Sequence, residues 1–352
     1  MSKLKIAVIF GGVSSEHDIS LISATNVIQN LSPEKYEVIP IGITKKGRWL
    51  YYPGEIVNIA SGKWDSHPDC VPCAILPDSM YKGIVKIEGD ELSTVKVDAV
   101  FPVLHGKNGE DGTIQGLLDM SQIPYVGCGC LASACCMDKS FTHMILDQNG
   151  IRTAKYRVIN QSDISSADKI CAEIASELGF PIFVKPARSG SSMGVNKASE
   201  LDDLINAVKL AFAHDNKVIC EEFIDGRELE CAVLGSDSPF ASQVGEILPC
   251  NDFYDYDAKY IMGTSGLDIP ANIPEEASKE IRETAVKAFR ALNCSGLSRV
   301  DFFLRKDGTV ILNEINTMPG FTPISMYPKL MENMGISYSE LLDRLISLAI
   351  EK

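Results

Sequence analysis

The stretch LSRVDFFLRKDGTVILNEINTMPG, residues 297–320, contains two apolar runs separated by Asp307-Gly308. An Asp-Gly pair between apolar runs is a strong signal for a β-hairpin. With Asp307 and Gly308 as the turn, the register pairs Lys306 with Thr309, Asp301 with Glu314 and Arg299 with Asn316. Side chains alternate along a strand, so the last two pairs share one face of the hairpin. The other face carries Val300, Phe302, Leu304, Ile311 and Ile315.

Two carboxylates that lie opposite each other in a hairpin repel unless a positive group lies between them. Oxygen ligands suit a hard divalent cation such as Mg²⁺, which takes one or two carboxylates and leaves its other positions to phosphate and water. The hairpin therefore predicts a magnesium site at Asp301, Glu314 and Asn316. The alternative is a solvated hairpin face whose charges share no ligand.

Length and composition narrow the class of protein. The chain has 352 residues, which suggests two or three domains, and 45% of them are hydrophobic and 23% charged, as in ordinary globular proteins. A net charge of −14 argues against nucleic acid as the main partner. No apolar run is long enough to cross a membrane. The N-terminal segment MSKLKIAVIFGG lacks a cleavage site and predicts a first buried strand.

The 11 cysteines include a cluster at Cys128, Cys130, Cys135 and Cys136. A zinc site is the alternative here, but no second Cys pair or His pair has the spacing that zinc requires. The odd count and the apolar surroundings favour small buried side chains in a reducing cytosol. We therefore expect no disulfide and no zinc.

The first third of the chain alternates strands and helices. Strands are predicted at 4–10, 36–43, 99–106 and 124–127, and helices after the loop that holds Glu16 and at 113–121. This order predicts a parallel, doubly wound sheet, whose ligands lie beyond the carboxyl ends of the strands. The loop around Glu16 and the loop that starts at His105 are the two candidates. A dinucleotide site is excluded because the glycine spacing and the acidic residue that it needs are missing.

The middle of the chain predicts a small α+β module. It contains a helix at 132–150, a strand–loop–strand unit at 180–198, a helix at 201–215 and a pair of strands around Asp225-Gly226. A polar, Tyr-rich loop around 250–268 and helices at 275–293 and 338–350 follow.

The loop KPARSGSSMG, residues 185–194, is suited to phosphate. Its glycines allow the backbone to approach a ligand closely, and Ser189, Ser191 and Ser192 add small donors. Lys185 ends an apolar strand, where an ammonium is costly without an anion. The alternative is a plain hairpin linker, and the loop is not a P-loop. The strand end at 221–224 could present backbone groups to an adenine edge.

These motifs occur together in one known family. The chain resembles the D-alanine–D-alanine ligases of the ATP-grasp superfamily over essentially its whole length. The resemblance is carried by IFGGVSSEHDIS, FPVLHGKNGEDGTIQG, MDKS, FVKPARSGSSMGV, YDYDAKY, SRVDFFL and LNEINTMPGFTPISMYP. It implies an α/β and α+β ATP-grasp fold with an N-terminal Rossmann-like parallel-sheet domain at 1–127, a small central domain at 128–224 and a catalytic domain at 225–352.

The resemblance also implies roles for individual residues. Lys139 and Lys185 would hold the ATP phosphates with Ser192, and Glu221, Phe223, Ile224 and Glu228 would bind adenine and ribose. Asp301, Glu314 and Asn316 would hold two Mg²⁺ ions, for which Mn²⁺ is a possible substitute. Glu16 would bind the ammonium of the first D-alanine in a set with Ser191 and Tyr260, with His105 nearby. Arg299 and the Gly320 amide would stabilise the tetrahedral intermediate. Ser325 and Met326 would border the second amino acid, and Lys259 and Tyr260 lie on a loop expected to close over the site.

The implied activity is the ATP-dependent ligation of two D-alanines through an acyl phosphate, for peptidoglycan precursors in the cytoplasm, by a homodimer. Tyr260 and the apolar Met326 resemble the D-Ala–D-Ala enzymes, whereas the segment VGCGCLASACCMDKS resembles ligases of the vancomycin-resistance type. D-serine as second substrate, with a role in antibiotic resistance, therefore stays open.

Two further hypotheses are a different ATP-grasp ligase and a catalytically dead nucleotide-binding regulator. A different ligase would share the lysines and the magnesium ligands, but it gives no reason for the set of Glu16, Ser191 and Tyr260. A dead regulator should have lost Arg299 or a magnesium ligand, and the sequence retains all of them.

Overall fold

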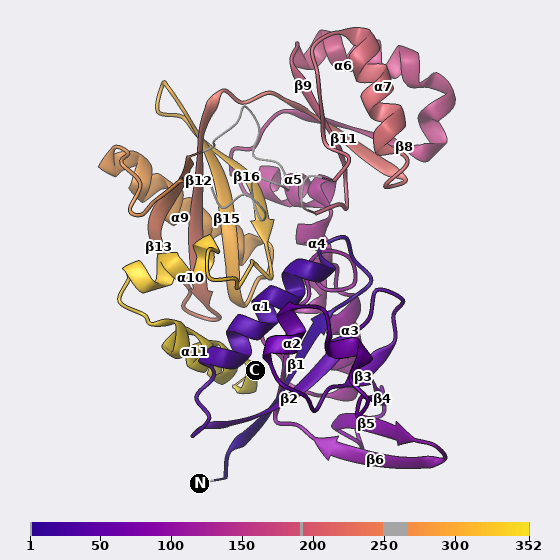
Figure 1. Cartoon of the computed structure of the whole chain (residues 1–352). Helices are drawn as coiled ribbons and strands as arrows, with labels where there is room; N and C mark the ends of the chain where they lie inside the picture. Colours follow the sequence, from indigo (N-terminus) through magenta and orange to yellow (C-terminus); the bar gives the residue numbers. More distant parts are fainter. Residues whose placement is uncertain (1, 191–192, 249–265, 352) are drawn as a thin grey trace.

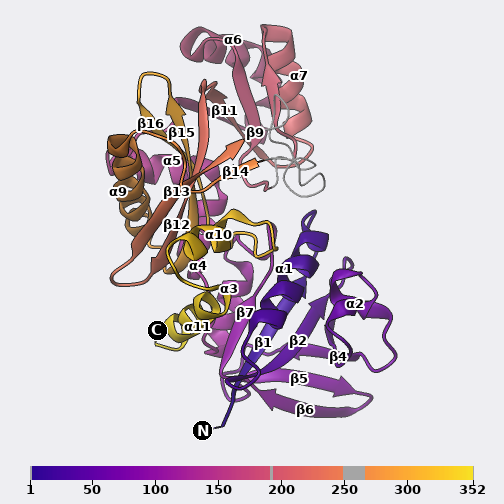
Figure 2. The same cartoon turned by 60° about the vertical axis from the view of Figure 1, so that its left-hand side comes forward.

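The computed structural model of the chain describes residues 2–190, 193–248 and 266–351. Three sheets and the helices around them make up the molecule (Figures 1 and 2). The helices are α1 (His17–Asn30), α2 (Val57–Ala60), α3 (Thr113–Ser121), α4 (Cys130–Met137), α5 (Lys139–Gln148), α6 (Ala167–Leu178), α7 (Leu201–Ala211), α9 (Glu275–Ala291), α10 (Met326–Asn333) and α11 (Tyr338–Ile350). Short 3-10 turns, η1 and η2, span Trp64–Ser66 and Gln161–Ser166. No helix in the described ranges combines the length and apolarity needed to cross a membrane.

The N-terminal sheet has seven strands in the order β6-β5-β4-β3-β2-β1-β7. Their bounds are β1 (Leu4–Gly11), β2 (Tyr36–Ile43), β3 (Trp49–Tyr51), β4 (Val71–Ile75), β5 (Gly83–Glu88), β6 (Glu91–Lys96) and β7 (Ala99–Pro102). Strand β1 pairs in parallel with β2 and β7, and β3 to β6 add antiparallel pairs. The predicted parallel sheet is therefore confirmed for β2, β1 and β7, at one end of the sheet, and the remaining strands are antiparallel. The predicted strand at 124–127 is reduced to one bridge between Val100 and Tyr125.

The middle lobe is a four-stranded sheet in the order β10-β9-β11-β8, which α6 and α7 cover. Its strands are β8 (Tyr156–Asn160), β9 (Ile182–Pro186), β10 (Asn196–Ala198) and β11 (Lys217–Glu222). The third sheet has the order β14-β13-β12-β15-β16. Its strands are β12 (Gly226–Gly235), β13 (Phe240–Leu248), β14 (Gly266–Asp268), β15 (Gly296–Arg305) and β16 (Val310–Asn316). The two strands around Asp225-Gly226 therefore belong to different sheets and do not pair with each other.

The predicted helix at 132–150 is wrong in one respect, because Asp138 divides it into α4 and α5. The backbone of Asp138 is extended, and its carboxylate accepts hydrogen bonds from the amides of Ser140 and Phe141. This is helix N-capping, which favours a new start at Lys139 over a continuous helix. Lys139 therefore begins α5 with its ammonium near the cavity described below.

The domain division at 1–127, 128–224 and 225–352 stays a prediction. Each predicted domain contains one of the three sheets. However, Cys128, Ala132 and Leu146 pack in the core of the five-stranded sheet rather than in that of the four-stranded sheet. This packing favours counting the segment 128–151 with the C-terminal domain.

The hairpin of β15 and β16 has the predicted pairs of Arg299 with Asn316 and Asp301 with Glu314. The tip of the hairpin differs from the predicted two-residue turn. Arg305 lies opposite Thr309, so residues 306–308 form a three-residue turn in which Gly308 has φ +86°. The predicted pair of Lys306 with Thr309 is therefore wrong. A bulge restores the predicted register further along, since Phe302 pairs with Leu312 and leaves residue 313 unpaired.

The bulge also changes which side chains share a face. Ile311 lies opposite Phe303 and packs with it, Ala154 and Ile224, not with the core face that Val300 and Phe302 share. The prediction of Ile311 on the core face is wrong for this reason. The extra residue, Asn313, lies beside Glu314 and lines the cavity.

The segment 317–321, which follows β16, connects the C-terminal sheet to the N-terminal domain through hydrogen bonds and packing. Phe321 is fully buried, and its carbonyl accepts hydrogen bonds from Asn26 of α1 at 2.8 Å and from Tyr338 of α11 at 2.7 Å. Its ring packs edge to face with Phe101 of β7. Helix α11 lies beside α1 on the same core. The end of β16 therefore has a fixed position over the N-terminal sheet.

Two residues of the loop after β7, His105 and Glu110, form further contacts with this segment at Met318. His105 Nδ1 lies 3.1 Å from the Met318 carbonyl, and Nε2 lies 3.1 Å from the Ser23 hydroxyl. Since a carbonyl only accepts, Nδ1 carries the proton. Burial lowers the pKa of His105, so Nε2 accepts from Ser23. Glu110 accepts from the amides of Gly106 at 2.7 Å and Met318 at 3.3 Å.

We predict that Glu110 makes stability depend on pH. Burial, and then the charge of Glu16, raise the pKa of Glu110 to about 8. Between about pH 5 and pH 8 the native state keeps a proton that the unfolded chain has released, so the free energy of unfolding falls as pH rises through this window. Glu110→Gln keeps the uncharged form at every pH and should flatten the curve by up to about 1.4 kcal/mol per pH unit.

Urea unfolding at intervals from pH 5 to pH 8 measures the difference between wild type and variant. The exposed Glu91→Gln is the matched control and should run parallel to wild type. Parallel curves for Glu110→Gln and wild type would show that the carboxyl ionises normally in the folded protein.

Candidate active site

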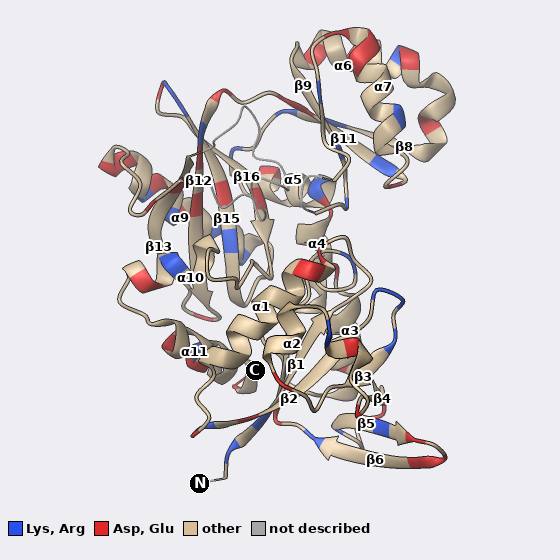
Figure 3. Ribbon diagram, in the orientation of Figure 1, with Lys and Arg blue, Asp and Glu red and all other residues tan. Residues whose placement is uncertain are grey.

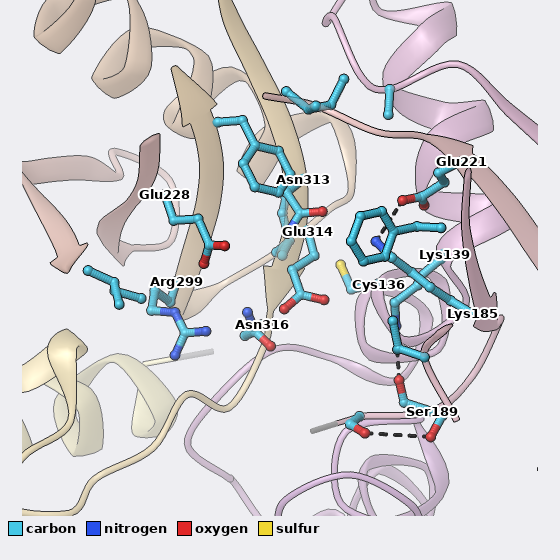
Figure 4. A pocket seen from close by; sticks show the side chains of 18 of the residues that line it. Cys136, Lys139, Lys185, Ser189, Glu221, Glu228, Arg299, Asn313, Glu314 and Asn316 are labelled. Carbon is cyan, nitrogen blue, oxygen red and sulfur yellow. Dashed lines mark hydrogen bonds and ion pairs between the residues drawn. The ribbon is translucent and has the colours of Figure 1, made fainter. Parts of the chain in front are cut away.

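A cavity of about 760 Å³ lies where the loops of the N-terminal sheet meet the two other sheets. Such a volume suits a small-molecule ligand of nucleotide size. Among the predicted site residues, those that line it are Glu16, His105, Lys139, Lys185, Glu221, Phe223, Ile224, Glu228, Arg299, Glu314, Asn316 and Gly320. Charged residues gather on β12, β15 and β16 (Figure 3), and the side chains labelled in Figure 4 surround the cavity. The structure therefore brings most of the predicted site residues to one place.

Arg299 lies on the hairpin between carboxylates. Its Nε lies 2.8 Å from Asp301 Oδ1 and 3.0 Å from Glu230 Oε2, and its Nη2 lies 2.7 Å from Asp301 Oδ2. All three side chains are at most 15% exposed. A buried guanidinium needs such partners because a desolvated charge is costly. Its position beside Asn316 leaves it at the edge of the cavity.

The predicted metal ligands fit a hard cation in part. Glu314 and Asn316 offer oxygens to the cavity, and their chemistry suits Mg²⁺. Asp301 is different, because Arg299 binds both of its oxygens and the Asn316 amide donates to one at 3.1 Å. Within the described residues no group of three His, Cys, Asp or Glu side chains is arranged to hold a metal ion. Asp301 would have to exchange Arg299 for the cation to become a ligand.

The ammonium of Lys185 has an anion, as its buried position requires. Its Nζ lies 2.6 Å from Glu221 Oε2, and the other oxygen of Glu221 lies 3.0 Å from His143 Nε2. Burial alone would lower the pKa of Lys185, but the charge of Glu221, with those of Glu314 and Glu228, raises it. Burial would likewise raise the pKa of Glu221, yet Lys185 and His143 hold it well below its usual range. The pair is therefore charged in the folded protein.

The phosphate loop comes close to the other predicted residues. Lys139 Nζ donates to the Ser189 carbonyl at 2.9 Å. A Cβ added to Gly190 would lie 2.7 Å from Glu16 Oε2, so only glycine allows this approach of the loop to the Glu16 carboxylate. Glu16 itself precedes α1 and is 6% exposed. Ser191, Ser192, Lys259 and Tyr260 lie outside the described residues.

An apolar wall lies on the side of the middle lobe. Phe183 and Phe223 stack at 5.9 Å between ring centroids, and the ammonium of Lys197 lies 4.5 Å from the centroid of Phe223. Ile224 and Phe303 line the same cavity. Flat apolar surfaces of this kind suit an aromatic base.

Two predicted substrate-binding residues, Ser325 and Met326, do not line the cavity. Met326 is 5% exposed and packs on β13, where a Cβ at Gly245 would lie 2.8 Å from its sulfur. Ser325 bonds to Thr322, with its hydroxyl 3.0 Å from the Thr322 amide. Its oxygen would lie 2.7 Å from a Cβ at Gly320, so Ser325 borders the cavity only through that glycine.

Sequence reasoning missed Glu110, Asn313 and His143. Glu110 lies inside the quoted motif FPVLHGKNGEDGTIQG, so the motif contained the signal. Asn313 reaches the cavity only because of the bulge, which the alternation of side chains does not reveal. His143 contacts Glu221, 78 residues away, which no local pattern indicates.

Between residues 2 and 248 and from 266 to 351, leaving out 191 and 192, the cysteines form no metal site or disulfide. Those in the described part of the chain are free, and most are buried. Cys136 lines the cavity, and burial raises the pKa of Cys73 and Cys231 to about 12. They pack as small apolar side chains.

Both parts of the chain match one family. Residues 5–128 match the family described as D-ala D-ala ligase N-terminus, and residues 145–347 match D-ala D-ala ligase C-terminus.

Individual relatives agree with this match over the whole chain. The D-alanine–D-alanine ligase of Caldicellulosiruptor bescii is 52% identical, with coverage of 100% of this chain and 96% of the relative. That of Acetivibrio thermocellus is 51% identical, with coverage of 99% and 96%.

Two solved structures have closely similar folds. The VanG D-Ala:D-Ser ligase from Enterococcus faecalis has a TM-score of 0.90 and 44% identity, with coverage of 99% of this chain and 100% of that chain. The D-alanine-D-alanine ligase from Coxiella burnetii has a TM-score of 0.87 and 35% identity, with coverage of 99% and 96%. The chain therefore belongs to the D-alanine–D-alanine ligase family, whose ATP-grasp fold its three sheets form.

Proposed function

We propose that this ligase joins two D-alanines to D-Ala–D-Ala at the expense of ATP, through an acyl phosphate. The observation that carries the proposal is the cavity that brings the lysines Lys139 and Lys185 opposite Glu314, Asn316 and Arg299. A site with two lysines on one side, and with oxygen ligands and an arginine on the other, suits the transfer of a phosphoryl group. The names of the relatives at 52% and 51% identity support D-alanine as both substrates.

The chemistry explains why such a site is needed. A carboxylate is a poor electrophile, so the γ-phosphoryl group of ATP first converts it to an acyl phosphate, and the amine of the second amino acid then attacks. Bound magnesium would supply charge neutralisation on the phosphates. Lys139 and Lys185 would bind the same phosphates, with Ser192. Glu314 and Asn316 would hold the two cations, for which Mn²⁺ is a possible substitute, and Asp301 would join them once Arg299 releases it.

The base and the ribose of ATP would bind on the side of the middle lobe. Phe223 and Ile224 of the apolar wall would hold adenine, and Glu228, on β12, would reach the ribose. Glu221 would act differently from the prediction, because Lys185 and His143 occupy both of its oxygens. Its contribution to adenine binding would come from the backbone of its strand.

The amino-acid end of the site would lie near Glu16. Its carboxylate would bind the ammonium of the first D-alanine, with Ser191, Tyr260 and Lys259 as further groups and His105 close by. Arg299 and the Gly320 amide would stabilise the oxyanion of the tetrahedral intermediate. Arg299 can do this only after giving up part of its contact with Asp301. One cation arriving at Asp301 would therefore free Arg299 for the reacting carbonyl.

D-serine is the second candidate for the second substrate. The observation in its favour is the TM-score of 0.90 to the VanG D-Ala:D-Ser ligase. Met326, which we expected to report on this choice, packs in the core against Gly245 and would act only through the position of α10. Ser325 would act through Gly320. We further propose a cytoplasmic role in peptidoglycan precursor synthesis and a homodimeric assembly.

A competition assay tests the proposed activity. Purified protein with ATP, Mg²⁺ and D-alanine should form mostly D-Ala–D-Ala, with or without an equal concentration of D-serine, when products are identified by mass. Removal of Mg²⁺ with a chelator should abolish the product. A mainly D-Ala–D-Ser product would contradict the choice of second substrate. Absence of any dipeptide would contradict the ligase proposal itself.

We predict that Glu314→Gln lowers kcat by about 100-fold or more, because it removes a carboxylate that would hold charge-neutralising cations. Glu314 is half-buried at the cavity, so the fold should be retained. Steady-state rates at saturating ATP, with circular dichroism to check folding, measure the effect. The exposed Glu283→Gln on α9 is the control. A variant that keeps a tenth or more of the wild-type kcat would exclude Glu314 as a cation ligand.

A further inference from the structure

A buried chain of three ionisable groups links helix α5 to the four-stranded sheet. His143 comes from α5, Glu221 from β11 and Lys185 from β9. The exposed fractions of their side chains are 3%, 6% and 15%. Of the three, Lys185 and Glu221 line the cavity, and His143 lies behind them.

The hydrogen bonds of His143 show which ring nitrogen donates to Glu221. Nε2 lies 3.0 Å from Glu221 Oε1, and a carboxylate accepts, so Nε2 carries a proton. Nδ1 lies 2.9 Å from the Thr153 hydroxyl, which can either donate to it or accept from it. The ring also packs against Tyr156, with 4.4 Å between centroids. His143 therefore has one orientation, and in it a donor points at Glu221.

Glu221 in turn determines where the Lys185 ammonium lies. Its second oxygen lies 2.6 Å from Lys185 Nζ. Two other carboxylates, Glu314 and Glu228, attract the same ammonium across the cavity. If Glu221 lost its donor, one of its oxygens would be left unsatisfied in a buried place, and its hold on Lys185 would loosen. Lys185 could then turn toward Glu314, where it would compete with a cation.

We propose that His143 is a positioning residue for nucleotide binding, which acts through Glu221 to hold Lys185 on the phosphate side of the cavity. This inference rests on the proposed function, because it takes ATP as the ligand of Lys185. Preorganisation of this kind improves affinity, since the ammonium does not have to be reoriented when the phosphates arrive. His143 itself touches no substrate.

Two amide substitutions separate this role from a merely structural one. The amide of glutamine can take the place of Nε2 and keep the donor to Glu221, whereas that of asparagine can take only the place of Nδ1. His143→Asn should raise the KM for ATP, and the Kd for ATP with Mg²⁺ by calorimetry, about tenfold. The KM for D-alanine should stay within about twofold. His143→Gln should stay within about twofold of wild type in all three quantities.

A double-mutant cycle with Glu221→Gln separates the proposed role from a folding defect of His143→Asn. A folding defect would weaken ATP binding in both backgrounds, whereas an effect through Glu221 would disappear in Glu221→Gln. If His143 acts through Glu221, adding His143→Asn to Glu221→Gln should change the Kd for ATP by less than about twofold. A further loss of about tenfold, or equal effects of His143→Asn and His143→Gln, would overturn the proposal. An unchanged KM for ATP in His143→Asn would do so as well.

The outcome is distinguishable from failure of the proposed function. If wild type makes no dipeptide, the ligase proposal fails, but the binding of ATP with Mg²⁺ still compares the variants. If wild type makes dipeptide and the two amide variants do not differ, only the role of His143 fails.

Discussion

The cost of burying charge is the constraint on which the site depends. The cavity walls contain Lys185, Arg299 and several carboxylates in positions that water reaches poorly. Each of these cations is therefore paired within the protein, Lys185 with Glu221 and Arg299 with Asp301 and Glu230. A desolvated charge without a partner would cost several kcal/mol, which is a large part of the stability of a domain. Both buried cations therefore have a carboxylate partner before any ligand enters.

This pairing would couple ligand binding in the proposed reaction to an exchange of ion-pair partners. In the proposed reaction, phosphates that bind Lys185 would share it with Glu221, and a cation that binds Asp301 would replace Arg299. Neither exchange leaves a buried charge alone, because the arriving ligand brings the opposite charge. The exchange at Asp301 would free the Arg299 guanidinium in the cavity that Gly320 also lines, where an oxyanion would develop. Substrate binding and the assembly of the oxyanion site would then be one event.

Rigid packing behind the cavity keeps these partners in place. The segment 317–321 is fixed by Asn26, Tyr338 and the buried ring of Phe321. His105 and Glu110 attach the loop after β7 to Met318 in the same segment. Groups that come from the N-terminal sheet and from the C-terminal sheet therefore meet at a defined distance. This is a general requirement of catalysis by positioning.

The sequence predicted the fold class and most of the residues that line the cavity, but it did not predict local irregularities of the hairpin and the helices. Motifs such as FVKPARSGSSMGV indicate candidate site residues directly. The pairs of Asp301 with Glu314 and Arg299 with Asn316 follow from the Asp-Gly turn signal. The bulge at residue 313 could not be predicted, because apolar residues lie on both sides of the hairpin tip. The break at Asp138 has a capping signal, but the apolar residues around it fit a continuous helix equally well. Met326 lies in the core because α10 packs on Gly245, a contact between segments 81 residues apart.

The transfer of oxygen from substrate to phosphate tests the central claim most directly. D-Alanine labelled with ¹⁸O in its carboxylate would be incubated with the enzyme, ATP and Mg²⁺, and the released phosphate analysed by mass. Activation of the carboxylate by the γ-phosphoryl group predicts one ¹⁸O in each phosphate released with a dipeptide. Phosphate without the label, formed together with dipeptide, would show that the cavity does not make an acyl phosphate and would contradict the account.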